Sequence, residues 1–157
     1  MSLNVQRYKR KVFLIPPVYF VIAIGFAFGC YWQLPQLNLL TGTTSDVVGI
    51  AALAVGCYLM LFSVLHLYRE KTTFHFDRSS SVVSSGHYRF SRNPIYLGKL
   101  IFLLGLSVIL GNVLAFGSAV FYFAVINQMF LPYEEEKMEI ELGAPYLEYK
   151  AKVRRWL

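Results

Sequence analysis

The chain has 157 residues, of which 56% are hydrophobic and 15% are charged, and its formal net charge is +6. A soluble domain of this length usually carries more charge, so the composition predicts a single domain whose main solvent is lipid. The positive charge then matches the anionic inner leaflet of a membrane, and we expect no nucleic-acid partner.

Four apolar runs predict membrane-spanning helices and therefore an all-α integral membrane protein. They cover roughly residues 12–32, 47–68, 94–110 and 113–131. Each run is near the ~20 residues that cross the hydrocarbon layer. Buried helices of a soluble protein can also be apolar, but four such runs in so short a chain favour the membrane. Residues 132–157 then predict cytosolic helices within the same domain.

The first run has a second interpretation, because a basic arm precedes it as in a signal peptide. Residues 27–30 (AFGC) are faintly similar to a lipoprotein cleavage site. The run is long for a signal peptide and Phe28 is bulky for that site, so we expect a retained span. Cys30 and Cys57 lie inside predicted spans, and their spacing predicts neither a disulfide nor a metal site. His66, at the end of the second run, is interpreted as an interfacial polar residue.

Lysine and arginine are distributed unevenly around the four runs. They are dense in the N-terminal arm, in residues 69–93 and in the tail, and absent from residues 33–46. The positive-inside rule therefore predicts that both termini and residues 69–93 face the cytosol. Lys99, one turn into the third run, can extend to the same side. We expect a multi-pass protein of a prokaryotic inner or plasma membrane.

The most informative motif is GHYRFSRNPIYLG, residues 86–98. It places Arg89 and Arg92 directly before Pro94, where the third run begins, and an acidic block (residues 134–136) follows the fourth run. Either cluster alone has an ordinary explanation, since the arginines suit the positive-inside rule and the glutamates suit a helix N-terminus. Both clusters next to span ends on one face predict a polar ligand at the cytosolic surface.

These residues resemble the signature of the isoprenylcysteine carboxyl methyltransferase and phospholipid methyltransferase superfamily of small integral membrane enzymes. That signature reads approximately G-x-Y-R-x-x-R-H/N-P-x-Y-x-G and is followed by a further span and a Glu-Glu pair. The residues that match the downstream pattern are Glu134, Glu135, Leu142, Gly143, Tyr146, Tyr149, Val153, Arg154 and Arg155, with Leu142 where phenylalanine is commoner in the family. The resemblance covers roughly residues 72–157, and the first two runs match only in kind.

The resemblance implies a methyltransferase that uses S-adenosylmethionine as methyl donor. In such a site Glu134 or Glu135 would bind the amino group of the donor, and Arg92 with Asn93 would bind its carboxylate. Aromatic side chains would face the adenine ring, and a glycine would allow close approach of a helix or ligand. The implied cofactor-binding residues are Tyr88, Arg92, Asn93, Pro94, Tyr96, Leu97, Gly98, Glu134 and Glu135.

The catalytic roles are expected to fall on Arg89 and Arg92. The donor has one carboxylate, so we expect Arg89 to hold an anionic head group of the acceptor. Asn93 stands where many family members have histidine, and asparagine cannot take a proton. A carboxylate or thiolate acceptor needs no base, whereas an ammonium must first lose a proton.

The acceptor itself stays open at this point. A membrane lipid or another lipophilic or small molecule would serve, with a prenylcysteine carboxylate, a phospholipid amine and a thiol as the alternatives. A protein of another class, a non-catalytic membrane scaffold or lipid-binding protein that retains the fold, is the competing hypothesis. The residues indicate no particular oligomeric state.

Overall fold

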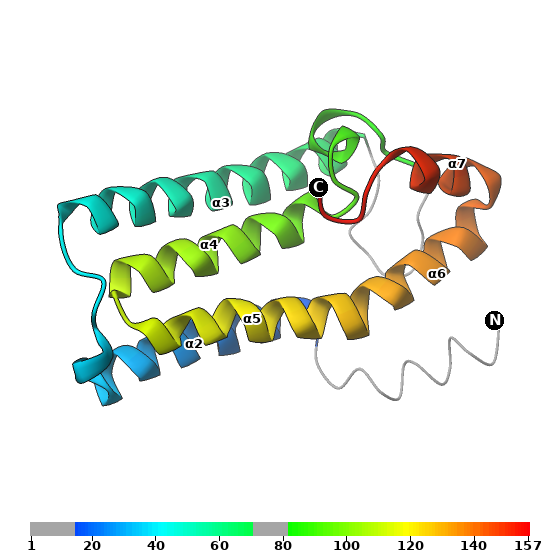
Figure 1. Cartoon of the computed structure of the whole chain (residues 1–157). Coiled ribbons are helices and arrows are strands. Elements are labelled where there is room, and N and C mark those ends of the chain that lie inside the picture. The colour runs from blue at the N-terminus through cyan, green and yellow to red at the C-terminus, as the bar shows by residue number, and fades with distance from the viewer. Residues whose placement is uncertain (1–14, 71–81) are drawn as a thin grey trace.

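The computed structural model describes residues 15–70 and 82–157, and the basic N-terminal arm lies outside them. In these residues the chain forms helices that run alongside one another, with α4 between α3 on one side and α2 and α5 on the other (Figure 1). The helices of this bundle are α2 (Pro16–Gln33), α3 (Thr43–Arg69), α4 (Pro94–Leu110) and α5 (Phe116–Val125). The predicted all-α class is confirmed for the described part of the chain.

Two helices are long and apolar enough to cross a membrane. They are α3, with 27 residues and mean hydropathy 2.4, and the continuous run Val113–Leu142, with 30 residues and mean hydropathy 1.7. The helix α4 is apolar but shorter. The helix α2 begins at Pro16, with Ile15 as its extended N-cap, and residues 12–14 of the first predicted run lie outside the described residues. The arrangement with four spans stays a prediction.

The long run Val113–Leu142 extends beyond its apolar part. Thirty residues of helix measure about 45 Å, whereas the hydrocarbon layer is ~30 Å thick. Within this run, the first charged residue is Glu134. We therefore treat residues 113–131 as the segment for the hydrocarbon and the part from Pro132 as lying outside it.

The centre of the bundle is packed closely on both sides of α4. A Cβ atom on Gly98 would lie 2.8 Å from the carbonyl oxygen of Gly56 in α3, so these two helices touch backbone to backbone. Small residues allow such close approach between membrane helices. On the other side, Leu103, Tyr122 and Ile126 are fully buried among α2, α4 and α5.

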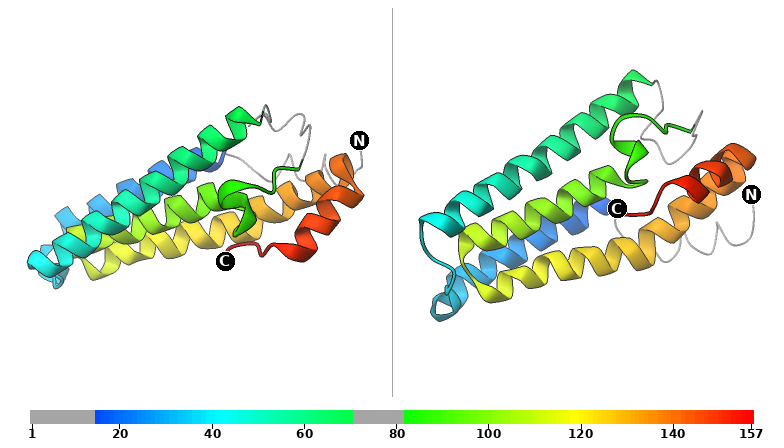
Figure 2. Two further views of the ribbon diagram at one scale, coloured as in Figure 1. Left: turned by 90° about the horizontal axis from the view of Figure 1, so that it is seen from above. Right: turned by 45° about the horizontal axis from the view of Figure 1, so that its top comes forward.

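The bundle changes direction after α5. A π-helical turn, Ile126–Phe130, joins α5 to α6 (Leu131–Leu142), so the helix continues through Pro132 instead of starting anew there (Figure 2). The wider turn precedes a proline that has no N–H to donate. Gly143, with φ 60°, then reverses the chain into α7 (Ala144–Lys152).

The opposite end of the bundle is closed by a tight hairpin between α4 and α5. Gly111 has φ 66° and a 3₁₀ turn, Val113–Ala115, leads into α5. Asn112 is fully buried, and its Nδ2 donates to the carbonyl oxygens of Cys30 and Leu34 at 3.2 and 3.0 Å and to Oδ1 of Asn38 at 2.7 Å. This asparagine ties the hairpin to the segment that joins α2 and α3.

Candidate functional site

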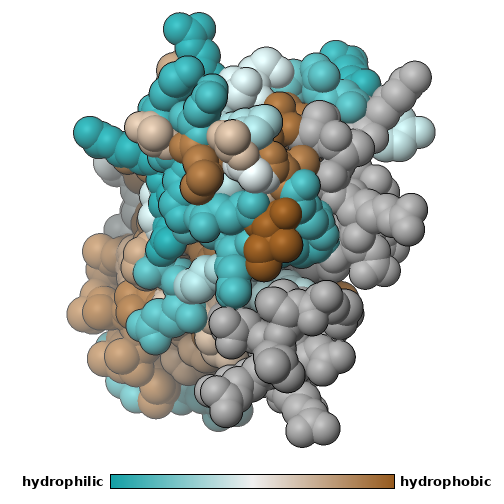
Figure 3. Space-filling model, turned by 90° about the vertical axis from the view of Figure 1, so that its right-hand side faces the viewer, coloured by the Kyte–Doolittle hydropathy of each residue, from teal (hydrophilic) through white to brown (hydrophobic). Residues whose placement is uncertain are grey.

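A cavity of about 860 Å³ lies at the end of the bundle where α3 ends and α4 begins. Its polar wall is formed mainly by Tyr88, Arg92, Asn93, Tyr96, Glu134 and Glu135. Its apolar wall is formed mainly by Cys57, Met60, Leu61 and Val64 of α3 together with Val82 and Val83. Hydrophilic side chains gather over this end of the molecule, and apolar ones lie beside them (Figure 3). The cavity therefore joins a charged region to an apolar one.

Most of the cofactor-binding residues that the sequence predicts line this cavity. They are Tyr88, Arg92, Asn93, Pro94, Tyr96, Glu134 and Glu135. Leu97 and Gly98 do not line it, and Gly98 instead packs against Gly56 of α3. Arg89 is exposed and also lies outside the lining, with its guanidinium 5.8 Å from the centre of the Phe90 ring. The roles of these residues stay predictions.

The two charge clusters that the sequence singles out meet at Glu135. Its carboxylate is 6% exposed and accepts two hydrogen bonds from Arg155, both at 2.8 Å. Arg92 Nη2 lies 3.2 Å and Lys150 Nζ 3.5 Å from the same carboxylate. Burial alone would raise the pKa of Glu135, but the hydrogen bonds from Arg155 and the neighbouring cations hold that pKa below its usual range. Glu135 is therefore an ionised centre that fixes its neighbours.

The guanidinium of Arg92 retains unused donors. Its side chain is 9% exposed, and Nε and Nη1 are buried with no hydrogen-bond partner among the described residues. Buried donors without a partner are costly and rare in folded proteins. The backbone N–H of Arg92 donates to the carbonyl of Arg154 at 3.0 Å, so the position of the residue is held independently. Because Arg92 also lines the cavity, its guanidinium could donate to an anionic ligand group there.

Glu134 differs from its neighbour Glu135 in its surroundings. Its Oε1 accepts a hydrogen bond of 2.6 Å from the hydroxyl of Tyr96. Lys99 Nζ lies 5.5 Å from the centre of the Tyr96 ring and also lines the cavity. Burial raises the pKa of Glu134 to about 7, although the Tyr96 hydrogen bond and nearby lysines act in the opposite direction. A cationic ligand group would therefore stabilise this carboxylate.

The side chain of Asn93 holds the C-terminal segment. Its Nδ2 donates to the carbonyl oxygen of Arg155 at 3.0 Å, and its backbone N–H donates to Oγ of Ser91 at 3.1 Å. The hydroxyl of Tyr149 donates to the carbonyl oxygen of Tyr88 at 2.7 Å. These bonds attach the Arg-Asn-Pro segment to α7 and the residues after it, which fixes the polar wall of the cavity.

Two residues of this network, Arg155 and Asn127, were not predicted to belong to the site. Arg155 is one of several cations in the tail, and nothing in the sequence separates it from Arg154. Asn127 lies in an uncharged apolar run, where its Oδ1 accepts hydrogen bonds from Trp156 Nε1 at 3.2 Å and Arg155 Nη1 at 3.4 Å. The only signal for Asn127 was an amide side chain within an apolar run.

Comparison with known proteins places this arrangement in a family. Protein-S-isoprenylcysteine O-methyltransferase A of Arabidopsis thaliana is 29% identical over 126 residues, which are 78% of this chain and 58% of that protein. A probable protein-S-isoprenylcysteine O-methyltransferase of Oryza sativa subsp. indica is 31% identical over 116 residues, which are 70% of this chain and 59% of that protein. The chain thus spans under two thirds of the length of these plant proteins.

A shorter relative and a family model complete the comparison. An uncharacterized protein of Haemophilus influenzae is 43% identical over 63 residues, which are 40% of this chain and 100% of that protein. No solved structure matches. The family model of phospholipid methyltransferases matches residues 44–143, which run from the start of α3 to the end of α6 and carry most of the cavity. The chain therefore belongs to the phospholipid methyltransferase family.

Proposed function

We propose that the protein is a membrane methyltransferase that transfers the methyl group of S-adenosylmethionine to a lipophilic acceptor at the cytosolic face of the membrane. The observation that carries this proposal is the cavity that Arg92 and Glu134 line together, since Arg92 has two buried donors without a partner among the described residues. When bound, S-adenosylmethionine supplies an electrophilic methyl group, whose bonding electrons return to sulfur as a lone pair of the acceptor forms the new bond. Family membership supports this class of reaction.

The residues of the polar wall fit the amino-acid part of the donor. Arg92 Nε and Nη1 offer two donors for its carboxylate. Glu134 offers a carboxylate for its ammonium, whereas Glu135 is already surrounded by Arg155, Arg92 and Lys150. We therefore assign the ammonium to Glu134 and the role of positioning Arg92 to Glu135.

The apolar wall fits the hydrocarbon part of an acceptor. Met60, Leu61 and Val64 of α3 line the same cavity as Arg92, so a lipid chain along this helix would bring its head group to the donor. Methyl transfer is a displacement that depends mainly on positioning. Position 93 supplies no histidine base, so a carboxylate or thiolate acceptor would react directly, and an amine acceptor would have to arrive without its proton.

We also propose that the cavity end of the bundle faces the cytosol, as the distribution of lysine and arginine predicts. In a variant whose native cysteines are replaced, a single cysteine at Thr43 should react with an impermeant maleimide added to intact cells, and one at Ser84 should not. Both positions are exposed. Labelling of the Ser84 variant alone would reverse the orientation and contradict access of the donor from the cytosol.

The enzyme proposal is tested by binding and by transfer. Purified protein in a neutral detergent should bind S-adenosylmethionine with a dissociation constant in the micromolar range. Radiolabelled methyl groups should then appear in the lipid extract of host membranes. Release of volatile methanol by base would identify an ester, and a base-stable product would identify an amine or thioether. Absence of binding by both S-adenosylmethionine and S-adenosylhomocysteine would contradict the proposal and favour a non-catalytic scaffold.

A further inference from the structure

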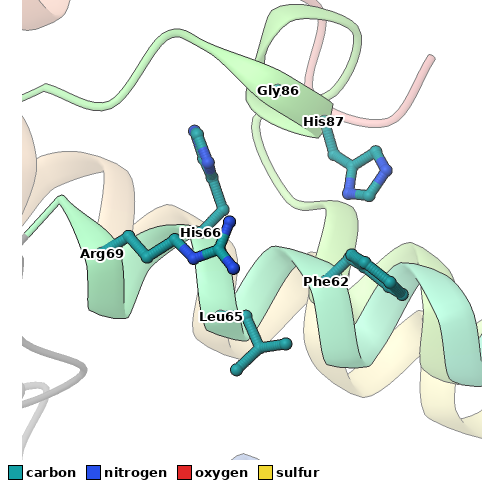
Figure 4. Close-up of a pocket in the computed structure, with 6 residues that line it drawn as sticks. All are labelled: Phe62, Leu65, His66, Arg69, Gly86 and His87. Atoms are coloured by element: carbon teal, nitrogen blue, oxygen red, sulfur yellow. The ribbon is translucent and has the colours of Figure 1, made fainter.

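A second, smaller pocket lies on another face of α3, away from the main cavity. It has a volume of about 180 Å³ and is lined by Phe62, Leu65, His66, Arg69, Gly86 and His87, none of which lines the main cavity. Figure 4 shows Arg69 and His66 together on α3, while His87 extends from the segment that crosses this helix. One arginine and two histidines, from α3 and from the segment that crosses it, therefore surround the same pocket.

The polar half of this pocket is rich in donors. Arg69 is exposed and has no ion pair in the described part of the chain. His66 Nε2 lies 2.8 Å from Oγ of Ser85, and His87 Nδ1 lies 3.1 Å from Oγ of Ser63. A ring nitrogen that accepts from a serine hydroxyl leaves the proton on the other nitrogen, which then donates. A guanidinium with two imidazole N–H groups suits the oxygen atoms of a phosphate.

The apolar half of the pocket lies on the exposed apolar surface of α3. Phe62 and Leu65 are 48% and 39% exposed, and they occupy the last turns of this apolar helix before Arg69. The pocket thus spans the boundary between hydrocarbon and head groups on the side that we assign to the cytosol. A free phosphate would use only its polar half. We propose that this pocket binds the phosphate of an anionic phospholipid, with an acyl chain against Phe62 and Leu65.

The pocket is connected to the main cavity through the segment that carries its second histidine. Gly86 has φ +58°, and a Cβ atom there would lie 3.2 Å from the ring of His66. That ring stacks on Tyr88 with a centroid distance of 6.4 Å and an angle of 22°, and Tyr88 lines the main cavity. A lipid that holds His66 and His87 therefore also holds Tyr88 in place. We expect it to strengthen binding of the methyl donor, a consequence that rests on the proposed function.

Lipid binding is measured by native mass spectrometry on the full chain in a neutral detergent, which lacks the general attraction of an anionic surface. Dioleoylphosphatidylglycerol should bind the wild type roughly tenfold more tightly than dioleoylglycerol, which has no phosphate, because a charged hydrogen bond is gained. Arg69→Gln should remove this preference. His66→Phe, which keeps a ring against Tyr88 but has no N–H, should weaken it. Lys152→Gln removes an exposed cation that does not line the pocket, and it should keep the preference.

The outcomes separate the proposal from its alternatives. Equal binding of the two lipids by the wild type, or a preference that survives in Arg69→Gln, would overturn the lipid site. Displacement of phosphatidylglycerol by inorganic phosphate at equal concentration would also overturn it, because the apolar half would then contribute nothing. Phosphatidylglycerol should raise the affinity for S-adenosylmethionine severalfold in the wild type and not in Arg69→Gln. A lipid preference without any donor binding would support the lipid site and contradict only the proposed function.

Discussion

The two ends of the helical bundle each contain a buried polar side chain, and the two side chains differ in how completely they are hydrogen-bonded. At the hairpin end, both polar atoms of the Asn112 side chain are used, since Nδ2 has three acceptors and Oδ1 accepts from the N–H of Leu114 at 3.0 Å. At the cavity end, Arg92 keeps Nε and Nη1 without a partner in the described structure. Complete hydrogen bonding indicates a structural role, and incomplete hydrogen bonding beside a cavity indicates a place for a ligand.

The largest loss of stability is expected on substitution of Glu135, the carboxylate that binds three cations at the cavity end of the bundle. Glu135→Gln keeps the shape of the side chain but leaves Arg92, Arg155 and Lys150 without their shared carboxylate. We expect the free energy of unfolding to fall by about 3 kcal/mol, at the lower end of the range for buried pairs because Arg155 and Lys150 are partly exposed. Unfolding in mixed micelles of dodecylmaltoside and dodecyl sulfate measures this change.

The matched control for Glu135 is Glu141→Gln, which removes a carboxylate from the same helix. Glu141 pairs with Lys137 at 3.6 Å one turn away, at a more exposed position. We expect its loss to change the free energy of unfolding by about 0.5 kcal/mol. Equal destabilisation by the two variants would show that Glu135 is not the centre of the cation network.

The next largest loss of stability is expected on substitution of Asn112 at the hairpin end of the bundle. Asn112→Ala removes the side-chain donor to the carbonyls of Cys30 and Leu34, which keep only their backbone donors, and the acceptor of the Leu114 N–H. The free energy of unfolding should therefore fall by about 2 kcal/mol. Asn38→Ala removes a single contact of the same network and should cost about 1 kcal/mol. Folded Asn112→Ala should bind the methyl donor as the wild type does. A loss of donor affinity in that variant would mean that the two ends are not independent.

A smaller effect is expected from the pH dependence of Glu134. Its pKa in the folded protein is raised to about 7, so the folded state binds this proton more tightly than the unfolded chain, and stability should decrease as pH rises from ~4.5 to 7. Donor binding requires the ionised form, so affinity should increase about fivefold between pH 6 and 7.5, where the donor amino group is still mostly protonated. Calorimetric titration at several pH values measures the affinity.

Glu134→Gln is the variant that isolates this carboxylate. It should bind the donor more weakly than the wild type, and its affinity and melting temperature should each lose the pH dependence described for Glu134. If the affinity of Glu134→Gln still rose with pH as in the wild type, another group would have to bind the ammonium.

The smallest effect is expected for Arg89. The sequence predicts that it holds the acceptor, but its guanidinium lies over Phe90 on the surface and outside the lining of the cavity. We therefore expect the turnover of Arg89→Lys to stay within about twofold of the wild type. A large fall in turnover, with unchanged donor affinity and melting temperature, would restore the acceptor role that the sequence predicts.

The sequence predicts the local features of this molecule better than its long-range contacts. Pro94, Gly111 and Gly143 mark helix boundaries that the structure confirms, because a missing donor or a positive φ is a property of the residue itself. The paired clusters at Arg92 and Glu135 were also found, since both lie next to apolar runs. The different roles of Glu134 and Glu135 were not predicted, because they depend on the cations that surround each carboxylate.

The missed contacts have a common physical origin. Arg155 reaches Glu135 only because the chain turns back at Gly143, and Asn127 meets Arg155 and Trp156 only because a π-helical turn directs it to them. Such contacts depend on the path of the backbone over many residues, and no spacing in the sequence records them. The small pocket at His66 and Arg69 was missed for the same reason, since residues 70–85 separate the part of its lining on α3 from Gly86 and His87 in the sequence.

The proposed binding of the donor carboxylate by Arg92 is tested directly by one comparison of dissociation constants. The dissociation constants of S-adenosylmethionine and of its decarboxylated analogue are measured for the wild type, for Arg92→Ala and for Arg154→Ala, whose side chain is exposed. The wild type and Arg154→Ala should prefer the carboxylate-bearing donor by roughly tenfold or more, and Arg92→Ala should bind both compounds equally weakly. If folded Arg92→Ala still preferred the carboxylate-bearing donor, the carboxylate would bind elsewhere and the proposed role of Arg92 would be contradicted.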